Sequence, residues 1–204
     1  WLMEQMRGQA ENVGTRMEYD YITDVDLSAR PFKATGDSGK VYTGDTLIIS
    51  TGAQARWLGL DSEYEFRGRG VSACATCDGF FFKNKDVAIV GGGNTAVEEA
   101  LFLTNFCSKV TLIHRRDSLR AEKIMQKRLF ENPKVEMMWD TTVEEVVGDD
   151  TGMTGLRLKS TKDGSESTLE AAGLFVAIGH DPATTLFKGQ LHMDDAGYIL
   201  TAPD

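Results

Sequence analysis

The decapeptide Val87-Ala88-Ile89-Val90-Gly91-Gly92-Gly93-Asn94-Thr95-Ala96 joins a short apolar strand to a helical pattern that covers about 94–106. It fits the spacing G-x-G-x-x-A with Gly91, Gly93 and Ala96. In this pattern the first glycine permits the tight turn, the second lets the backbone approach a pyrophosphate, and the small third residue allows the helix to pack closely on the strand. The free N–H groups and positive dipole end of the helix then face the phosphates. The decapeptide therefore predicts a dinucleotide-binding turn.

The segments around this turn alternate between strand and helix patterns. Because a strand–helix–strand–helix–strand order is typical of a parallel, doubly wound sheet, we expect an α/β, Rossmann-like fold of three layers: parallel sheet, helices and β-meander. Asp117 or Ser118 is expected to cap the second helix. The expected elements are strands at Val110–His114 and Val135–Trp139, a basic helix at 119–131, a meander at Thr142–Val147, Gly155–Ser160 and Ser167–Leu169, and a strand at Leu174–Ile178.

An internal repeat relates Ile22–Gly52 to Val143–Gly179, since each reads as short strands, a glycine-containing turn and an apolar strand that ends at glycine. In the first copy a matching glycine-rich turn would fall about 36 residues before residue 1. We therefore expect a fragment of a protein that binds two nucleotides. A helix is expected at 2–13, and strands at Met17–Asp20, Tyr21–Leu27, Pro31–Thr35 and Lys40–Ser50.

The charge balance narrows the classes of partner. The chain has 204 residues and a formal net charge of −9, so it is a poor general binder of nucleic acid or anionic lipid. No apolar run approaches the roughly 18 residues of a membrane span, and the first residues carry no signal-peptide pattern. We expect a cytoplasmic protein with no nucleic-acid partner and no membrane partner.

The turn after the second strand of the doubly wound pattern indicates which dinucleotide binds. An NAD site usually carries an acidic residue there, about 20 residues beyond the glycine turn, to bind the ribose 2′-hydroxyl. Here the segment reads His114-Arg115-Arg116-Asp117-Ser118-Leu119-Arg120. Arg115, Arg116 and Arg120 can converge on a 2′-phosphate with charge-assisted hydrogen bonds. The segment therefore predicts NADPH rather than NADH.

A third motif is Cys74-Ala75-Thr76-Cys77-Asp78-Gly79. One C-x-x-C is half of a zinc site, but the second half is absent, since only Cys107 and three scattered histidines remain. A pair of thiols at this spacing also suits an exchangeable disulfide, and Asp78 could then donate or accept the proton. We favour the redox interpretation and expect no metal; Cys107 is expected to be a small buried hydrophobe.

Joined together, these segments resemble the low-molecular-weight, bacterial-type thioredoxin reductases. The resemblance implies a homodimeric flavoprotein with an FAD domain and an inserted NADPH domain. Hydride would pass from NADPH to FAD, and electrons would pass to the Cys74–Cys77 disulfide and then to thioredoxin. The matching segments are Gly68–Phe82 with C-A-T-C-D-G, Val87–Asn105 with G-G-G-N-T-A, His114–Ala121 with H-R-R-D-x-x-R-A, and Leu174–His180 with F-V-A-I-G-H.

The resemblance also implies roles for individual residues. Cys74 would attack and release thioredoxin, Cys77 would lie nearer the flavin, and Asp78 would be the acid/base. The implied NADPH contacts are Gly91, Gly93, Asn94, Thr95, Ala96, His114, Arg115, Arg116, Arg120, Ile178 and Tyr198, and the implied FAD contacts are Thr51, Gly52 and Ala53.

The implied domains are a partial FAD domain at 1–55, the NADPH domain with its C-x-x-C at 56–185, and the start of a return into the FAD domain at 186–204. The N-terminal glycine-rich turn and the C-terminal segment for FAD are absent from the sequence. Three alternatives remain: the flavoprotein component of an alkyl hydroperoxide reductase, a ferredoxin-linked flavin reductase, and an NADP-binding module without turnover.

Overall fold

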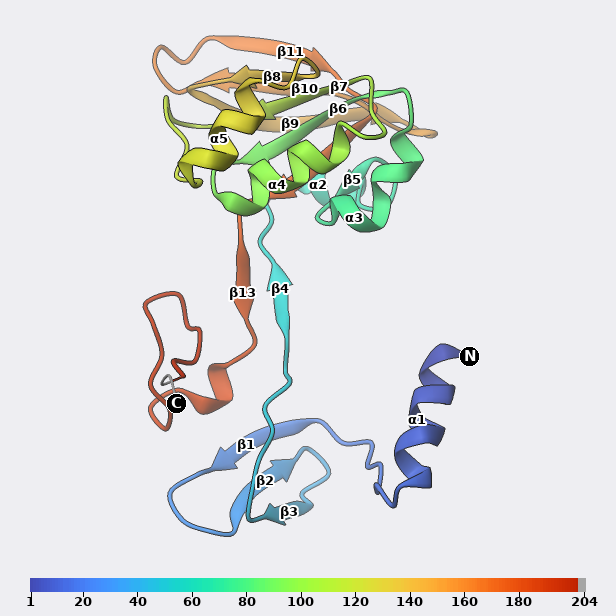
Figure 1. Cartoon of the computed structure of the whole chain (residues 1–204), viewed down its shortest axis with the longest axis vertical. Coiled ribbons are helices and arrows are strands. Elements are labelled where there is room, and N and C mark those ends of the chain that lie inside the picture. The colour runs from blue at the N-terminus through green and yellow to red at the C-terminus, as the bar shows by residue number, and fades with distance from the viewer. Residues whose placement is uncertain (202–204) are drawn as a thin grey trace. The chain divides into compact units, whose positions relative to one another are not determined.

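A computed structural model describes residues 1–201, and the chain divides into two compact units (Figure 1). The insert unit is continuous, Ala53–Asp181, whereas the split unit joins Trp1–Gly52 to Pro182–Asp204. The insert unit carries most of the predicted motifs. No helix among the described residues is long and apolar enough to cross a membrane.

A five-stranded parallel sheet forms the centre of the insert unit, in the order β5-β12-β6-β7-β8. Its register pairs Ala177 at the end of β12 with Gly91 at the end of β6. The doubly wound sheet predicted from the sequence is therefore confirmed. The strands are β5 (Val71–Ser72), β6 (Asp86–Gly91), β7 (Lys109–Ile113), β8 (Val135–Met138) and β12 (Gly173–Ala177).

Apolar side chains cover both faces of this sheet, as expected for parallel strands buried on both sides. In β12, Phe175 and Ala177 point to one face while Leu174 and Val176 point to the other. The first face packs against α4 and α5, and the second packs against a three-stranded antiparallel meander (Figure 1). These layers comprise α4 (Asn94–Leu103), α5 (Lys123–Phe130), β9 (Thr141–Asp149), β10 (Gly152–Ser160) and β11 (Glu166–Glu170).

Shorter elements complete the insert unit. α2 and α3 flank β5, a 3-10 turn (η1) follows α3, and β4 pairs with β13. Their bounds are β4 (Ala53–Ala55), α2 (Asp61–Glu65), α3 (Ala75–Asp78), η1 (Gly79–Phe82) and β13 (His180–Pro182).

The split unit holds a second antiparallel meander, β1-β2-β3, so both copies of the proposed repeat contain one. The apolar segment Leu47–Ser50 of the first copy is not a strand, although Leu174–Ala177 of the second copy is. The predicted strand Met17–Asp20 is irregular and was wrong, and the predicted strand Lys40–Ser50 is confirmed only over Val41–Gly44. The elements are α1 (Leu2–Asn12), β1 (Ile22–Asp26), β2 (Phe32–Gly36), β3 (Val41–Gly44) and a 3-10 turn, η2 (Thr185–Phe187).

The basic helix begins later than the sequence predicted. α5 starts at Lys123, and neither Asp117 nor Ser118 caps it; Glu122 is the N-cap and makes no side-chain cap. The residues before it are fastened to the glycine turn instead, because the Arg120 N–H donates to the Gly92 carbonyl at 2.7 Å. Tertiary hydrogen bonds therefore hold this segment out of the helix.

Candidate nucleotide and disulfide site

A cavity of about 600 Å³ lies in the insert unit beside the glycine turn. It is lined at the carboxyl ends of β6, β7 and β12, which is where ligands bind in open α/β sheets. Its lining residues are Arg56, Trp57, Leu58, Val90, Gly91, Gly92, Gly93, Thr95, Ile113, His114, Arg115, Arg120, Thr141, Thr142, Val143, Glu144, Ala177, Ile178 and Gly179.

The glycine turn leaves room for a ligand at one position only. A Cβ at Gly91 would collide with the Ala177 carbonyl, and a Cβ at Gly92 would collide with the His114 ring. A Cβ at Gly93 would meet no atom within 4 Å, so the backbone there borders open space. Gly93 is also the N-cap of α4, whose first N–H groups have no partner within the helix. This cradle fits a pyrophosphate.

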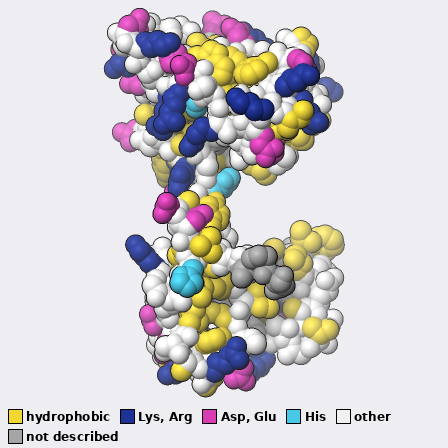
Figure 2. Space-filling view, turned by 60° about the vertical axis from the view of Figure 1, so that its left-hand side comes forward, with side chains coloured by type: hydrophobic (Ala, Val, Ile, Leu, Met, Phe, Trp, Pro, Cys, Tyr) yellow, Lys and Arg dark blue, Asp and Glu magenta, His cyan; other side chains and the backbone are white. Residues whose placement is uncertain are grey.

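The segment after β7 brings positive charge to the cavity. Arg115 and Arg120 line it, and both side chains are exposed. Within residues 1–201 no carboxylate lies within ion-pair distance of Arg115, Arg116 or Arg120. Figure 2 shows several Lys and Arg side chains on one face of the insert unit. Guanidinium groups free of protein carboxylates suit a bound phosphate.

His114 is different in kind from its arginine neighbours. The ring is 8% exposed, and its Nε2 lies 3.0 Å from the Ser118 carbonyl. Burial lowers the pKa of His114, and the nearby positive charges of Arg116 and Arg115 lower it further. The hydrogen bonds of the ring to the backbone of Ser118 and Gly91 raise the pKa, but they do not outweigh burial. The imidazole is therefore neutral at pH 7 and shapes the cavity without adding charge.

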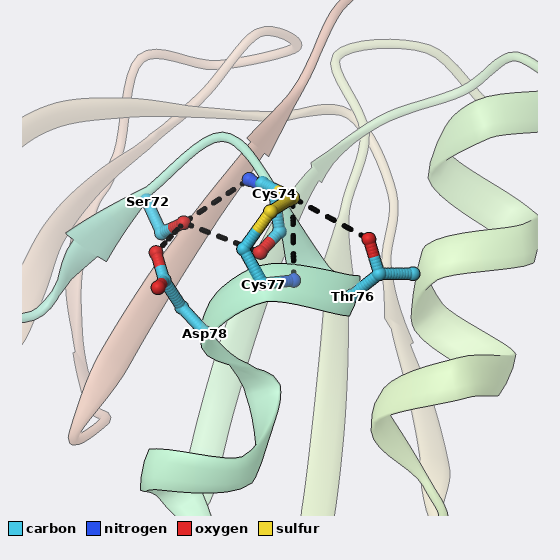
Figure 3. The surroundings of a disulfide bond; sticks show 5 residues. All are labelled: Ser72, Cys74, Thr76, Cys77 and Asp78. Carbon is cyan, nitrogen blue, oxygen red and sulfur yellow. Dashed lines mark hydrogen bonds between the residues drawn. A yellow bond between two sulfur atoms is a disulfide. The ribbon is translucent and has the colours of Figure 1, made fainter. Parts of the chain in front are cut away.

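The cysteine pair forms a disulfide at the start of α3 (Figure 3). Cys74 is the N-cap of this short helix, and its Sγ accepts a hydrogen bond from the Cys77 N–H at 3.2 Å. The Thr76 hydroxyl lies 3.4 Å from the same sulfur. Cys77 is exposed and Cys74 is half-buried. The Cys77 N–H and the Thr76 hydroxyl therefore both face the Cys74 sulfur.

Ser72 ties Asp78 to the disulfide. The Ser72 hydroxyl donates to Asp78 Oδ2 at 2.6 Å, and Ser72 Oγ accepts from the Cys74 N–H at 3.0 Å (Figure 3). Ser72 is itself buried. The carboxylate therefore keeps a fixed place beside the cysteines, as a group that handles a proton requires.

The third cysteine is unlike the pair. Cys107 is 1% exposed and carries a free thiol. Burial raises the pKa of Cys107 to about 11. The thiol is unreactive at neutral pH, which confirms the expectation of a small buried hydrophobe. No group of three metal-ligating side chains occurs among the described residues.

The disulfide and the cavity lie at one edge of the sheet. β5 leads into Cys74 and β6 leads into the glycine turn, and both strands run parallel to β12, which separates them. Because carboxyl ends of parallel strands meet at the same edge, the two features share it.

The structure brings together most of the residues predicted to bind NADPH. Six of them line the cavity with Ile178: Gly91, Gly93, Thr95, His114, Arg115 and Arg120. Asn94, Ala96 and Arg116 are not among its lining residues; Ala96 is buried against the sheet, and Asn94 Oδ1 accepts from the Glu122 N–H. Tyr198, Thr51 and Gly52 belong to the split unit, and Ala53 begins the insert unit.

Sequence reasoning missed a second wall of the cavity. Arg56, Trp57, Thr141, Thr142 and Glu144 line it but belong to no nucleotide motif. The Arg56 N–H donates to the Gly179 carbonyl at 2.9 Å, which brings two distant segments together. Gly92, which also lines the cavity, did have a local signal, because it stands in the unbroken run Gly91–Gly93.

The residues around the glycine turn fit an NADP nucleotide, because an open backbone cradle and unpaired guanidinium groups face one cavity. The split unit does not offer an equivalent site for FAD. Over 1–52 and 182–201 no strand leads through a glycine-rich turn into a helix. Thr51, Gly52 and Ala53 are exposed, and these residues alone do not make a flavin site.

Comparisons with known proteins agree with this architecture. Residues 4–204 match the family model of the pyridine nucleotide-disulphide oxidoreductases. The chain is 57% identical over 203 residues to thioredoxin reductase of Rickettsia felis, covering 98% of this chain and 66% of that protein. It is 56% identical over 202 residues to thioredoxin reductase of Escherichia coli O157:H7, covering 97% of this chain and 62% of that protein. The chain thus spans less than two thirds of these relatives.

Solved structures give the same result for the fold. Thioredoxin reductase from Giardia duodenalis superposes with a TM-score of 0.86 at 42% identity, covering 99% of this chain and 66% of that one. Thioredoxin reductase from Lactococcus lactis superposes with a TM-score of 0.79 at 36% identity, covering 98% of this chain and 66% of that one. The two-dinucleotide-binding fold expected from the sequence is confirmed.

Proposed function

The chain belongs to the pyridine nucleotide-disulphide oxidoreductase family, and we propose that the protein is an NADPH-dependent thioredoxin-disulfide reductase. One observation carries this proposal: one continuous unit holds both a disulfide, which follows β5, and a cavity lined by the glycine turn after β6 and by two arginines. The similarity to thioredoxin reductases over 98% of the chain supports it.

The cavity is proposed to hold NADPH through three kinds of contact. The Gly93 backbone and the first N–H groups of α4, near Thr95, bind the pyrophosphate. Arg115, Arg116 and Arg120 bind the 2′-phosphate, since Arg115 and Arg120 line the cavity and Arg116 is exposed between them in sequence. Ile178, just beyond β12, borders the remaining half of the cofactor. Asn94, Ala96 and His114 support this site, and Tyr198 is proposed as a contact from the split unit.

The cysteine pair is proposed to carry two electrons. Reduction breaks the Sγ–Sγ bond, takes up two electrons and two protons, and leaves two thiols. Asp78, fixed by Ser72, moves one of these protons to or from the cysteines. The Cys74 thiolate then attacks the disulfide of thioredoxin, and Cys77 closes the intramolecular disulfide and releases reduced thioredoxin.

The family implies a flavin as well as a pyridine nucleotide. We place FAD along Thr51, Gly52 and Ala53, with the FAD domain over 1–55 and 186–204 and the NADPH domain over 56–185. A homodimer and a cytoplasmic location are further parts of the proposal.

Thioredoxin reduction tests this proposal. The purified protein, with FAD, NADPH and oxidised thioredoxin, should consume NADPH and form thioredoxin thiols in equal stoichiometry. Cys77→Ser should abolish turnover, while Cys107→Ser, at the inert buried thiol, should retain it. Retained turnover in Cys77→Ser would reject the dithiol mechanism. NADPH binding without any oxidation would favour a module that binds NADP without turnover.

A further inference from the structure

A buried carboxylate lies behind the cavity. Glu63, in α2, is 0% exposed. Its Oε1 accepts from the Leu58 N–H at 2.9 Å, and its Oε2 accepts from the Gly59 N–H at 2.9 Å. A buried charge is costly unless it is paired and hydrogen-bonded, and these two hydrogen bonds offset part of that cost. The carboxylate fixes the backbone immediately after Trp57.

Arg67 supplies the opposite charge. Its Nη2 lies 3.7 Å from Glu63 Oε2, and its guanidinium carbon lies 3.8 Å from the centroid of the Trp57 ring. The Tyr64 ring lies 5.2 Å away from the same group. Arg67 Nε is buried, without a hydrogen-bond partner among the described residues. The shortest of these contacts is the cation–π contact with the Trp57 ring, and such contacts are strongest over tryptophan.

Trp57 separates this charged pair from the cavity. Trp57 and Leu58 line the cavity, whereas Glu63 and Arg67 do not. Arg56 joins the same segment to Gly179, just beyond β12. The arginines for the 2′-phosphate follow β7, on the other side of β6 from β12. A dinucleotide whose pyrophosphate lies at the Gly91–Gly93 turn extends to both sides of β6, so its nicotinamide half runs toward β12 and Trp57.

We propose that Glu63 and Arg67 are positioning residues for NADPH that act through Trp57, whose ring forms the wall against the nicotinamide half of the cofactor. This inference rests on the proposed NADPH site. Stacking by Arg67 holds the indole in one orientation, and Glu63 holds its backbone. Without either contact the indole gains rotamers, and ordering it again weakens binding.

The binding of two ligands can distinguish a role in positioning the nicotinamide half from a general effect on the stability of the protein. NADPH contains both halves of the cofactor, whereas 2′-phosphoadenosine 5′-phosphate contains only the adenine half. Calorimetry should measure both dissociation constants for the wild type, Glu63→Gln and Arg67→Met. Glu65→Gln and Arg69→Met are matched controls, because both residues are exposed on the same segment and line no part of the cavity.

We expect Glu63→Gln and Arg67→Met to weaken NADPH binding about tenfold, the scale of a lost stacking or charged contact. The adenine-half ligand should bind all five proteins equally. Arg67→Met keeps the Glu63 carboxylate and the hydrogen bonds that it accepts from the Leu58 and Gly59 N–H groups. Unchanged NADPH affinity in this variant would overturn the inference. An equal loss for both ligands would also overturn it. A wild type that binds neither ligand would instead reject the NADPH site itself.

Discussion

Three adjacent glycines lead from the end of β6 into α4, and each has different surroundings. Gly91 lies against the Ala177 carbonyl of the neighbouring strand, Gly92 lies against the His114 ring, and Gly93 faces open space. The first two are required by the fold, whereas the third is free for a ligand. The same change, glycine to alanine, should therefore affect stability at position 92 and ligand binding at position 93.

Gly93→Ala should leave the fold intact and impair nucleotide binding. Its φ of −95° suits alanine, and no atom lies within 4 Å of the new methyl group. We expect the free energy of unfolding to change by less than about 0.5 kcal/mol and the Kd for NADPH to rise about tenfold. Gly92→Ala should instead lose about 1–3 kcal/mol of stability, because the His114 ring must move. Urea denaturation and calorimetry measure both, and identical behaviour of the two variants would contradict this account.

Arg120→Ala should change cofactor preference. Its guanidinium lines the cavity without a carboxylate partner among residues 1–201, so only a ligand phosphate would pair with it. A charge-assisted hydrogen bond is worth about 1.5–3 kcal/mol, so NADPH should bind at least about tenfold more weakly while NADH is unaffected. Arg128→Ala, at an exposed position of α5, is the control. Equal losses for NADPH and NADH would refute the 2′-phosphate role.

The buried His114 predicts a pH dependence. Its pKa in the fold is lowered below the unfolded value, so the unfolded chain binds the proton more readily. The resulting stability is present above the usual histidine pKa of about 6.5 and is lost as the pH falls through the lowered value. The free energy of unfolding should therefore decline below about pH 6.5 more steeply in the wild type than in His114→Gln. Parallel pH profiles would show that the imidazole is not held neutral.

At the scale of elements, the segment 115–122 shows why one boundary escaped prediction. Its composition favours a helix, yet two hydrogen bonds tie it to the glycine turn and to the start of α4: Arg120 N–H to the Gly92 carbonyl, and Glu122 N–H to Asn94 Oδ1 at 2.8 Å. Both partners lie more than 20 residues away in sequence. The spacing of apolar residues along the sequence predicts the strands and α4, because that pattern is local. It cannot reveal hydrogen bonds to residues that are distant in sequence.

Asn94→Ala tests whether this fastening positions the arginines. Loss of one hydrogen bond should cost about 0.5–1.5 kcal/mol of stability. Hydrogen exchange at the Glu122 amide should accelerate, and NADPH should bind more weakly because the arginine segment is less ordered. Asn105→Ala is a matched control, since its side chain binds the Phe102 carbonyl at the far end of α4. Unchanged exchange over 115–122 would contradict the assignment.

At the scale of the whole chain, the sequence was most informative where chemistry is contiguous. The glycine turn, the arginine segment and the C-x-x-C each lie within a dozen residues, and all three were recognised from local pattern. The wall formed by Arg56, Trp57 and Glu144 was missed, because segments far apart in sequence assemble it. In the split unit, Leu47–Ser50 reads as a strand but is irregular over the described residues. Its apolar pattern alone does not supply a pairing partner.

The insert unit unites the cavity and the disulfide, whereas the chain spans 66% of the Rickettsia felis relative and 62% of the Escherichia coli relative. The proposed function therefore depends first on whether the insert unit binds NADPH. The most direct measurement is a calorimetric titration of the 204-residue chain with NADPH and, separately, with NADH. We predict one NADPH per chain and at least about tenfold weaker binding of NADH. Equal affinities, or no binding of NADPH, would contradict the account.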